Sequence, residues 1–493
     1  MTLTSANRAQ VGFGVEATFG TLPPTPTIYN LRISGAPLKF APKTQVSDEI
    51  RADGQITDLI LIGTEVSGDV TFDLTYNMVD PFLEAVTGGT WNNNPSIVNA
   101  TAGTQISALS ATGPTVAAGG AGFVSGMLTL LSNFPTPANN KLAVVASSTA
   151  TSIVYPTATF TAETATIPVN ATIRQVGFQG AAGDIGAVAT GLQSTVLDFT
   201  TLGLNVGEWV VIGDTDTAGC SFATPACNGR GRIAAIAPHA LTFDEVPPGW
   251  TADAGATKTI RVFSGDFLVN STVKRSFFFE EQQLDANTPF YQYYVGCFID
   301  KVSLSIEAEK KITATVSIKG KTQIPQTARV AGAIDVAAPA FDVMNAATNV
   351  GRLALAGVPV NPTGPNYSMK NAIDINANGV AAPAIGVLGP VDIVRGEFAV
   401  TGSVDNYLGD LTQVQALIAN SAFSQDIKFG RLDGNRESYA IDLPRCKYSS
   451  GDTPVPAKNQ LRMFSGGYQA LRDPVKGYTI SIGRYWYLPA TNN

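Results

Sequence analysis

The first hundred residues contain a clear alternation of apolar and polar positions. Between 66 and 74 (VSGDVTFDL) both valines, Phe72 and Leu74 fall on one side of an extended chain, with polar residues on the other. A period of two is typical of a strand with one buried face. The same alternation occupies 298–306 and 312–318, on either side of the charged segment EAEKK, and predicts a β-hairpin.

A short helix is predicted directly after the first of these strands. Asp80 and Pro81 resemble an N-cap followed by proline at the first helical position. Apolar residues follow on one side of the helix, and Gly88 is expected to end it. The local order is therefore strand and then helix.

This order occurs a second time in the last third of the chain, where a strand at 397–404 precedes a helix at 410–418. Gly68 and Gly402 are separated by the same offset as Leu83 and Leu417. We interpret this as an internal duplication of one β domain with a flanking helix. The second copy is expected to close on strands near 438–443, 462–471 and 478–485.

The stretch between the two copies divides into further segments. Residues 101–262 are rich in Ala, Gly, Thr and Ser, and contain two loosely similar stretches that predict one or two small inserted β modules. A Pro- and Ala-rich linker is expected at 326–341. The predicted organisation is a first domain at 1–100 with 263–325, the inserted module or modules, the linker, and a second domain at 342–493.

Composition supports an all-β-dominated fold. Charged residues are only 14% of the 493, whereas the chain has 48 glycines and 29 prolines, a mixture typical of short strands joined by many turns. The net charge of −7 disfavours a protein that grips nucleic acid by neutralising phosphates. The N-terminus lacks the pattern of a signal peptide, and no apolar run is long enough to span a membrane, so neither secretion nor membrane insertion is expected.

The residues that would support catalysis, metal binding or cofactor binding are sparse. His239 is the single histidine and lies between Pro238 and Ala240, as expected of a surface turn. The adjacent carboxylates Glu280 and Glu281 are expected on a solvated strand edge rather than as a catalytic pair. We therefore assign no catalytic, cofactor or metal site, and predict that the protein is not an enzyme.

Two of the four cysteines, Cys220 and Cys227, are close enough in sequence to form a disulfide. Two free thiols are the alternative, and they suit a protein made in a reducing cytoplasm.

Several segments resemble the tail tube proteins of siphophages, whose tails are long and non-contractile. The resemblance is carried by VSDEIRADGQITDL at 46–59, VSGDV at 66–70, FLEA at 82–85 and GGTW at 88–91. Further support comes from 274–280, 297–306, 442–447 and 468–471. It covers about two-thirds of the chain and excludes 101–260.

The resemblance implies β-sandwich or barrel domains, each with a short helix, whose sheets join between copies into a ring around a lumen. Stacked rings would form the virion's tail tube, a conduit for DNA ejection, assembled from protein made in the host cytoplasm. The hairpin loop at 42–65 would reach the next ring, with its register set by Asp48, Glu49, Arg51, Asp53 and Asp58; an ordinary solvated loop is the alternative for these charges.

The resemblance also implies partners. These are a tail-tip or baseplate initiator, a tape measure protein and a tail terminator, while DNA passes without specific binding. Because the chain carries two tube domains, a homotrimer forming a pseudo-hexameric ring is favoured over a ring of six chains. The inserted modules would decorate the outside. The main alternative function is a β-rich surface adhesin or carbohydrate-binding protein, and a hydrolase is a third class.

Overall fold

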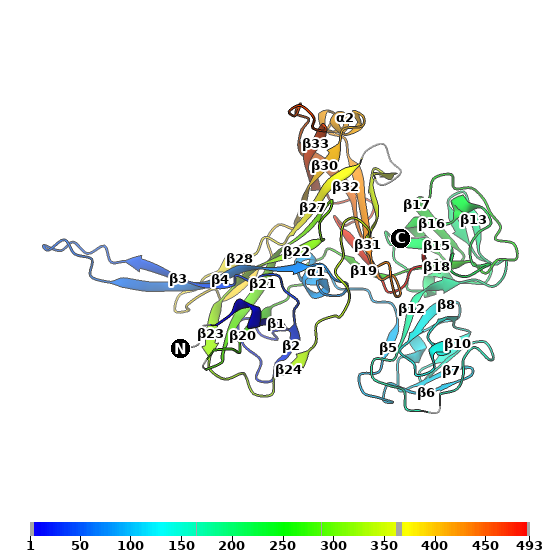
Figure 1. Ribbon diagram of the computed structural model, residues 1–493, viewed down its shortest axis with the longest axis horizontal. Coiled ribbons are helices and arrows are strands. Elements are labelled where there is room, and N and C mark those ends of the chain that lie inside the picture. Colours follow the sequence, from blue (N-terminus) through cyan, green and yellow to red (C-terminus); the bar gives the residue numbers. More distant parts are fainter. Residues whose placement is uncertain (1–3, 164, 287, 361–366, 491–493) are drawn as a thin grey trace.

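The protein is described by a computed structural model covering residues 4–163, 165–286, 288–360 and 367–490. The fold is dominated by strands, as predicted. A central β region carries a long two-stranded projection on one side and a separate lobe on the other (Figure 1).

Unit 1, the first copy of the duplicated fold, contains the strands predicted from the alternation. Val66, Val70, Phe72 and Leu74 are all buried, which confirms the predicted face. Its elements are η1 (Ala6–Arg8), β1 (Ala9–Val15), β2 (Thr27–Asn30), β3 (Lys39–Val46), β4 (Leu59–Asp73), α1 (Asp80–Thr87), β20 (Phe277–Gln283), β21 (Phe290–Glu307), β22 (Thr313–Gly320) and β23 (Thr322–Gln326).

The start of α1 differs from the sequence prediction. Asp80 is the first helical residue, the N-cap position belongs to Val79, and no side chain caps the helix. Asp80 is instead buried and accepts hydrogen bonds from Tyr439 and Arg484. The predicted end is correct, because Gly88 adopts a φ of 64°, a left-handed conformation that suits glycine. A long-range ion pair thus replaces the local cap.

Unit 2, the second copy, repeats the element order of unit 1. The strands predicted near 438–443, 462–471 and 478–485 are present within β32, β33 and β34. The elements are β25 (Val350–Leu355), β26 (Val358–Pro359), β27 (Ser368–Asn376), β28 (Val380–Ala382), β29 (Asp392–Val394), β30 (Ala399–Tyr407), α2 (Thr412–Ile418), β31 (Phe423–Gly430), β32 (Ser438–Asp452), β33 (Met463–Ala470) and β34 (Ser481–Tyr485).

Strand registers match between the two units. Gly68 of β4 lies opposite Ile318 of β22, and Gly402 of β30 lies opposite Tyr468 of β33. Phe277 pairs with Cys297 in unit 1, as Phe423 pairs with Cys446 in unit 2. Both long strands also carry a register shift two or three residues later, between Ile299 and Lys301 and between Tyr448 and Ser450. The equivalence therefore extends to individual residues.

The two units form one continuous sheet. Its central path runs β3-β4-β22-β21 through unit 1 and β27-β30-β33-β32 through unit 2. The junction is the antiparallel pair β21–β27, whose register runs from Lys301 opposite Asn376 to Glu307 opposite Lys370. One large hydrophobic core lies behind this sheet and contains side chains from both units.

The inserted region lies between α1 and β20 and has its own hydrophobic core. It begins slightly before the predicted border, because β5 at 96–98 pairs with β12. Its elements are β5 (Ser96–Val98), β6 (Ile106–Ser110), β7 (Gly113–Val116), η2 (Gly120–Gly122), β8 (Met127–Ser132), η3 (Pro137–Asn139), β9 (Leu142–Val144), β10 (Ser147–Thr149), β11 (Ser152–Val154), β12 (Thr172–Gln179), β13 (Gly186–Val188), β14 (Gly191–Gln193), η4 (Phe199–Thr201), β15 (Trp209–Ile212), η5 (Pro225–Cys227), β16 (Gly229–Ala237), β17 (Ala240–Glu245) and β18 (Arg261–Phe263).

The two similar stretches within this region form similar loops. In the first, the side chain of Asn140 hydrogen-bonds both the backbone N–H and the carbonyl of Phe134. In the second, Asn228 makes the same two bonds to Phe222. Each asparagine follows a one-turn helix that begins at proline, which indicates a repeated loop design.

Further strand pairings tie the parts together. The linker contains a short strand, β24 (Ile334–Val336), that pairs in parallel with β2. The strand β34 pairs with both β32 and β19 (Asp266–Val269), which follows the inserted region. The C-terminal part of the chain therefore returns to the boundary between the units and the lobe (Figure 1).

Candidate assembly surfaces

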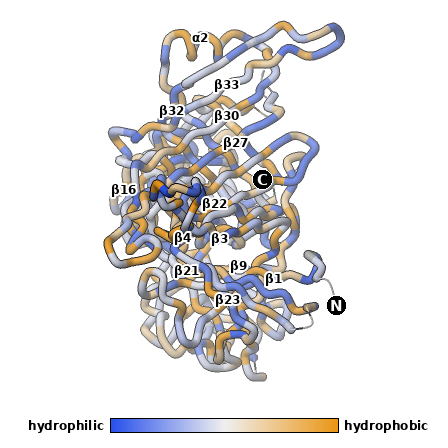
Figure 2. Tube along the Cα trace, turned by 90° about the vertical axis from the view of Figure 1, so that its left-hand side faces the viewer, coloured by the Kyte–Doolittle hydropathy of each residue, from blue (hydrophilic) through white to orange (hydrophobic). Residues whose placement is uncertain are grey.

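The central sheet has one buried face and one polar face. Along β4, β22, β21, β27, β30 and β33, residues at every second position are buried against the core, and the residues between them are partly exposed. Hydrophobic and hydrophilic segments accordingly alternate along these strands in Figure 2. Serine and threonine predominate on the polar face, as in Ser67, Thr71, Thr313, Thr315, Ser317, Ser303, Ser305, Thr401, Ser403 and Ser465.

Carboxylates outnumber lysines on the same face of these six strands. The carboxylates are Glu65, Asp69, Asp73, Glu307, Asp374 and Asp405, and the lysines are Lys301, Lys319 and Lys370. One ion pair crosses the junction between the units, with 3.1 Å between Lys301 Nζ and Asp374 Oδ2. The face is thus hydrophilic and mildly acidic.

Each end of the central path leaves a strand edge without a described partner. In the described chain β3 pairs only with β4, so its other edge is open. The last residues of β32 pair with β33 on one side only, whereas the earlier part of β32 is flanked by β31 and β34. Open edges are templates for pairing with another chain.

The loop predicted to reach another ring is the distal part of a long projecting hairpin, here called arm 1 (residues 42–65) (Figure 1). All five predicted charged residues lie between the ends of β3 and β4, at or beside its tip: Asp48, Glu49, Arg51, Asp53 and Asp58.

Contacts within the tip connect several of these side chains. Arg51 Nε lies 3.2 Å from Asp53 Oδ1, and this hydrogen-bonded cation lowers the pKa of Asp53. Thr57 Oγ1 donates to Glu49 Oε2 at 3.1 Å, and Asp58 accepts from the backbone N–H of Leu59. These pairs shape the tip, and all are exposed.

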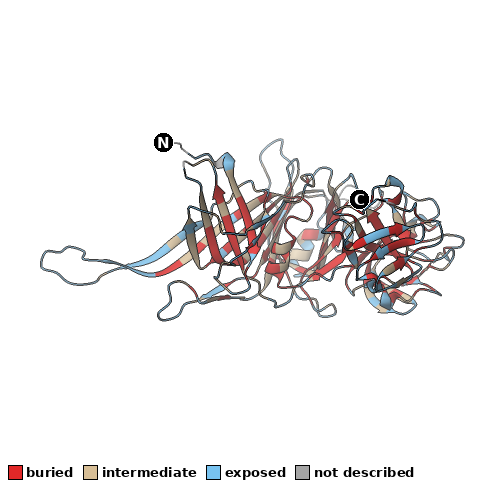
Figure 3. Ribbon diagram, turned by 90° about the horizontal axis from the view of Figure 1, so that it is seen from below, coloured by how far each residue is buried: buried red, intermediate tan, exposed pale blue. Residues whose placement is uncertain are grey.

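Apolar exposure on arm 1 is the feature that the charge-based prediction missed. Ile50 is fully exposed and Ile56 is 75% exposed. The run Leu59–Ile62 exposes all four side chains, which alternate between the two faces of the hairpin. Figure 3 shows this distal part as exposed. Such a surface on both faces is typical of a hairpin that is covered by partners after assembly. The signal was present as LILI beside an otherwise alternating strand.

Unit 2 carries the equivalent hairpin, arm 2 (residues 377–398), which was not predicted from the sequence. Val380 lies opposite Val394 in arm 2, as Gln45 lies opposite Ile60 in arm 1. Arm 2 folds onto unit 1, where Arg395 donates to the carbonyl oxygens of Ala85 and Val86 at the end of α1, both at 2.7 Å.

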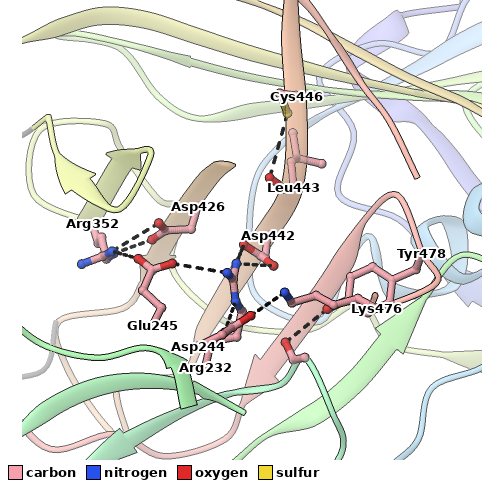
Figure 4. Close-up of polar contacts among 11 residues, drawn as sticks. Arg232, Asp244, Glu245, Arg352, Asp426, Asp442, Leu443, Cys446, Lys476 and Tyr478 are labelled. Atoms are coloured by element: carbon pink, nitrogen blue, oxygen red, sulfur yellow. Dashed lines mark hydrogen bonds and ion pairs between the residues drawn. The ribbon is translucent and has the colours of Figure 1, made fainter. Parts of the chain in front are cut away.

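A buried ion cluster attaches the inserted region to unit 2 (Figure 4). Arg232 of β16 donates to Asp442 of β32 through Nη1, at 3.1 and 3.3 Å, and to Asp244 through Nε at 2.9 Å. Arg352 of β25 bridges Asp426 and Glu245. Burial raises the pKa of Asp442 to about 7, and the charge of Arg232 opposes that shift.

A second cluster joins unit 1 to the C-terminal strand. Arg484 of β34 pairs with Asp80 of α1 and with Asp266 of β19, the latter at 2.6 Å. Its guanidinium also lies over the rings of Trp91 and Trp486, at 4.6 and 5.1 Å. Neither cluster was predicted, because their members are far apart in sequence and form no local pattern.

Residues considered for other chemistry lie in structural settings. Cys220 and Cys227 are free and buried rather than disulfide-bonded, and their thiols contact Thr259 and a backbone carbonyl, respectively. His239 lies in the exposed turn between β16 and β17, as predicted.

The prediction for Glu280 was wrong. It is fully buried and pairs with Arg329 at 2.8 Å, whereas Glu281, on the opposite face of the strand, is half-buried and contacts Tyr294. Across the described residues, no group of three or more His, Cys, Asp or Glu side chains is arranged to hold a metal ion. Within the same ranges, every helix is too short or too polar to cross a membrane.

Comparison with known proteins supplies the family. A family model described as phage tail tube protein matches residues 6–208 and again 207–470, which together cover most of the sequence. Among curated proteins, no match was found. The model thus matches twice, with the border between the two matches inside the inserted region, and the family is a structural one. The chain belongs to the phage tail tube protein family, as the resemblance of its sequence implied.

Proposed function

We propose that this protein assembles into rings that stack into the tail tube of a long-tailed phage and guide DNA during ejection. Family membership supports the tube role. The central sheet has one polar face and two open edges, an arrangement that suits closure around a lumen.

The observation that carries the proposal is the junction β21–β27. It joins two equivalent four-strand sets side by side within one chain. Repeating the same step between chains continues the sheet, and three chains then supply six equivalent sets. A homotrimeric, pseudo-hexameric ring follows, in preference to six chains that each contribute one set.

The polar face is assigned to the lumen, because the other face is buried in the core. The excess of carboxylates would repel phosphate, and the neutral hydroxyl groups do not supply the cationic contacts that hold DNA. DNA would therefore pass without specific binding.

Stacking is assigned to arm 1, whose exposed apolar residues and charged tip extend beyond the sheet. The inserted region, which lies on the opposite side from the arm in Figure 1, would decorate the outside of the tube. The tail-tip initiator, tape measure protein and terminator are further expected partners, and no catalytic role is proposed.

Negative-stain electron microscopy with light scattering tests the proposal on the recombinant chain over a range of concentration and salt. Rings or hollow tubes of uniform width are expected, with threefold symmetry and a mass of three chains per ring. Six chains per ring would refute the trimer but keep the tube. A chain that stays monomeric at high concentration, even with an added tail-tip complex, would refute the tube and favour the adhesin.

A further inference from the structure

The junction inside the chain offers a residue-level template for the contact between chains. The first strand of the internal junction is the end of β21, whose equivalent in unit 2 is the end of β32. The second strand of the junction is β27, whose equivalent in unit 1 is β3. The equivalents are the two strand edges that lack a described partner, so an inter-chain junction would join β32 of one copy to β3 of the next. This step rests on the proposed ring.

The equivalence on the β32 side follows from the neighbouring strands. Ser303 of β21 lies opposite Thr315 of β22, which lies opposite Thr71 of β4. In unit 2, Asp452 of β32 lies opposite Ser465 of β33. Ser465 in turn lies opposite Asp405 of β30. Asp405 is the equivalent of Thr71, because the two are as far apart in sequence as Gly68 and Gly402. Asp452 is therefore the equivalent of Ser303.

The equivalence on the β3 side follows in the same way. Asp374 of β27 lies opposite Thr401 of β30. Lys39 of β3 lies opposite Ser67 of β4, and Ser67 precedes Gly68 as Thr401 precedes Gly402. Lys39 is therefore the equivalent of Asp374. Since Ser303 lies opposite Asp374 inside the chain, Asp452 and Lys39 become opposite residues between chains.

We propose that adjacent copies join head to tail through an antiparallel pair in which Leu38–Ala41 of one copy lies opposite Ser450–Thr453 of the next. Lys39 faces Asp452 on the polar side of the sheet. Lys39 takes the position equivalent to Asp374, which forms an ion pair with Lys301 inside the chain. Both Lys39 and Asp452 are exposed in the single chain, and neither belongs to an ion pair among the described residues. Opposite charges in register stabilise strand pairing.

On the core side of the same junction, Phe40 faces Gly451. The equivalent internal pair is Ile375 and Val302, and both side chains are completely buried. Phe40 is 37% exposed in the single chain.

Leu417 of α2 and Phe464 of β33 are the nearest side chains to the position that a Cβ of Gly451 would take. These two side chains already occupy the space over the glycine, so the ring of Phe40 would pack against them rather than against a side chain at 451. The junction thus buries an apolar side chain that the single chain leaves partly open.

Prolines set the length of this junction. The internal ladder continues through Ser305 and Ala372, whose equivalents are Pro454 and Pro37. Proline has no N–H to donate, so the ladder between chains ends after Thr453. The shorter junction also blunts the open edge of the free chain, which limits pairing out of register.

Disulfide trapping tests the register directly. Opposite residues of an antiparallel pair have Cα atoms about 4.5–5.5 Å apart, which suits a disulfide. The double variant Lys39→Cys with Asp452→Cys should form a covalent trimer on non-reducing gels after ring assembly and mild oxidation. Either single variant alone should remain uncrosslinked, and a mixture of the two should give dimers only.

The matched control moves one cysteine along the same strand and face. Lys43→Cys with Asp452→Cys is displaced by four residues and should not crosslink. The four native cysteines are buried and should not crosslink between chains, so the unaltered chain measures the background level of crosslinking. Rings seen by microscopy without crosslinking of the double variant, or stronger crosslinking of the displaced control, would overturn the register while leaving the tube function intact. A dimer formed by Lys39→Cys alone would overturn the head-to-tail arrangement.

Charge reversal gives an independent readout that a merely structural role would not produce. Lys39→Asp or Asp452→Lys alone should raise the concentration needed for half-maximal assembly roughly two- to fivefold. The double reversal should return it to the original value. A double variant whose half-maximal concentration is raised as much as in a single variant, or by both increases combined, would contradict a direct pair.

Discussion

Removing Arg232 should weaken the attachment of the inserted region to unit 2. The guanidinium is 8% exposed and neutralises Asp442, whose side chain is 1% exposed, together with Asp244 and Glu245. Arg232→Met fills a similar volume but leaves buried carboxylates without this cation. Breaking a buried pair from one side typically costs about 3–5 kcal/mol. Lys43→Met is the control, because the Lys43–Glu65 pair is about half exposed and should contribute at most about 1 kcal/mol.

Hydrogen exchange with mass spectrometry measures this loss locally, which matters because a chain of several parts need not unfold in one step. Peptides from β16–β17 and β32 should exchange roughly 10²- to 10⁴-fold faster in Arg232→Met, if opening there limits exchange. Adding Asp442→Asn should recover part of the protection, since the stranded charge is removed.

The effect of Arg232→Met should also be smaller at pH 5.5 than at pH 8. Burial already raises the pKa of Asp442 to about 7, so the stranded carboxylate can become neutral at the lower pH. Exchange in Arg232→Met within about twofold of the unaltered chain at pH 8 would refute the idea that this cluster holds the inserted region in place.

Three further outcomes are expected. Burial raises the pKa of Glu208 to about 7, above its usual 4.5, so its contribution to stability is complete below pH 4.5 and is lost as pH rises through 7. Glu208→Gln should therefore weaken the decline in melting temperature between pH 5 and 8, and an unchanged decline would contradict the assignment. Ile50→Asp, at a fully exposed position of arm 1, should leave rings intact but reduce stacking in micrographs; normal tubes would argue against the arm as the stacking element. Gly68→Ala should lower the melting temperature by an amount equivalent to about 1–3 kcal/mol, because Gly68 has a φ of 151° and an added Cβ would lie 2.5 Å from the Pro37 carbonyl oxygen; no change would show that the strand relaxes there.

Local periodicity determined much of what could be predicted. The alternation at 66–74, the hairpin around EAEKK, both helices and the matching glycines Gly68 and Gly402 all reflect contacts between near neighbours or one repeated pattern. Arm 2 was missed because its Gly- and Pro-containing sequence shows no strand alternation and shares no motif with arm 1, although the strand register is equivalent.

Long-range pairing was decided only by the tertiary structure. Asp80 had the sequence context of a cap, but its charge is neutralised by Arg484, about four hundred residues later. Glu280 looked like a strand-edge carboxylate until Arg329 was seen beside it. Arg232 and Asp442 belong to segments with no shared sequence pattern.

The sequence by itself therefore determined the strands, the helices and the duplication, because side-chain periodicity is a local property. Only the folded chain decided which strand edges meet, which remain open, and where the inserted region is attached. Burial makes an ion pair or a strand junction energetically specific, and burial depends on the packing of residues that are distant along the chain.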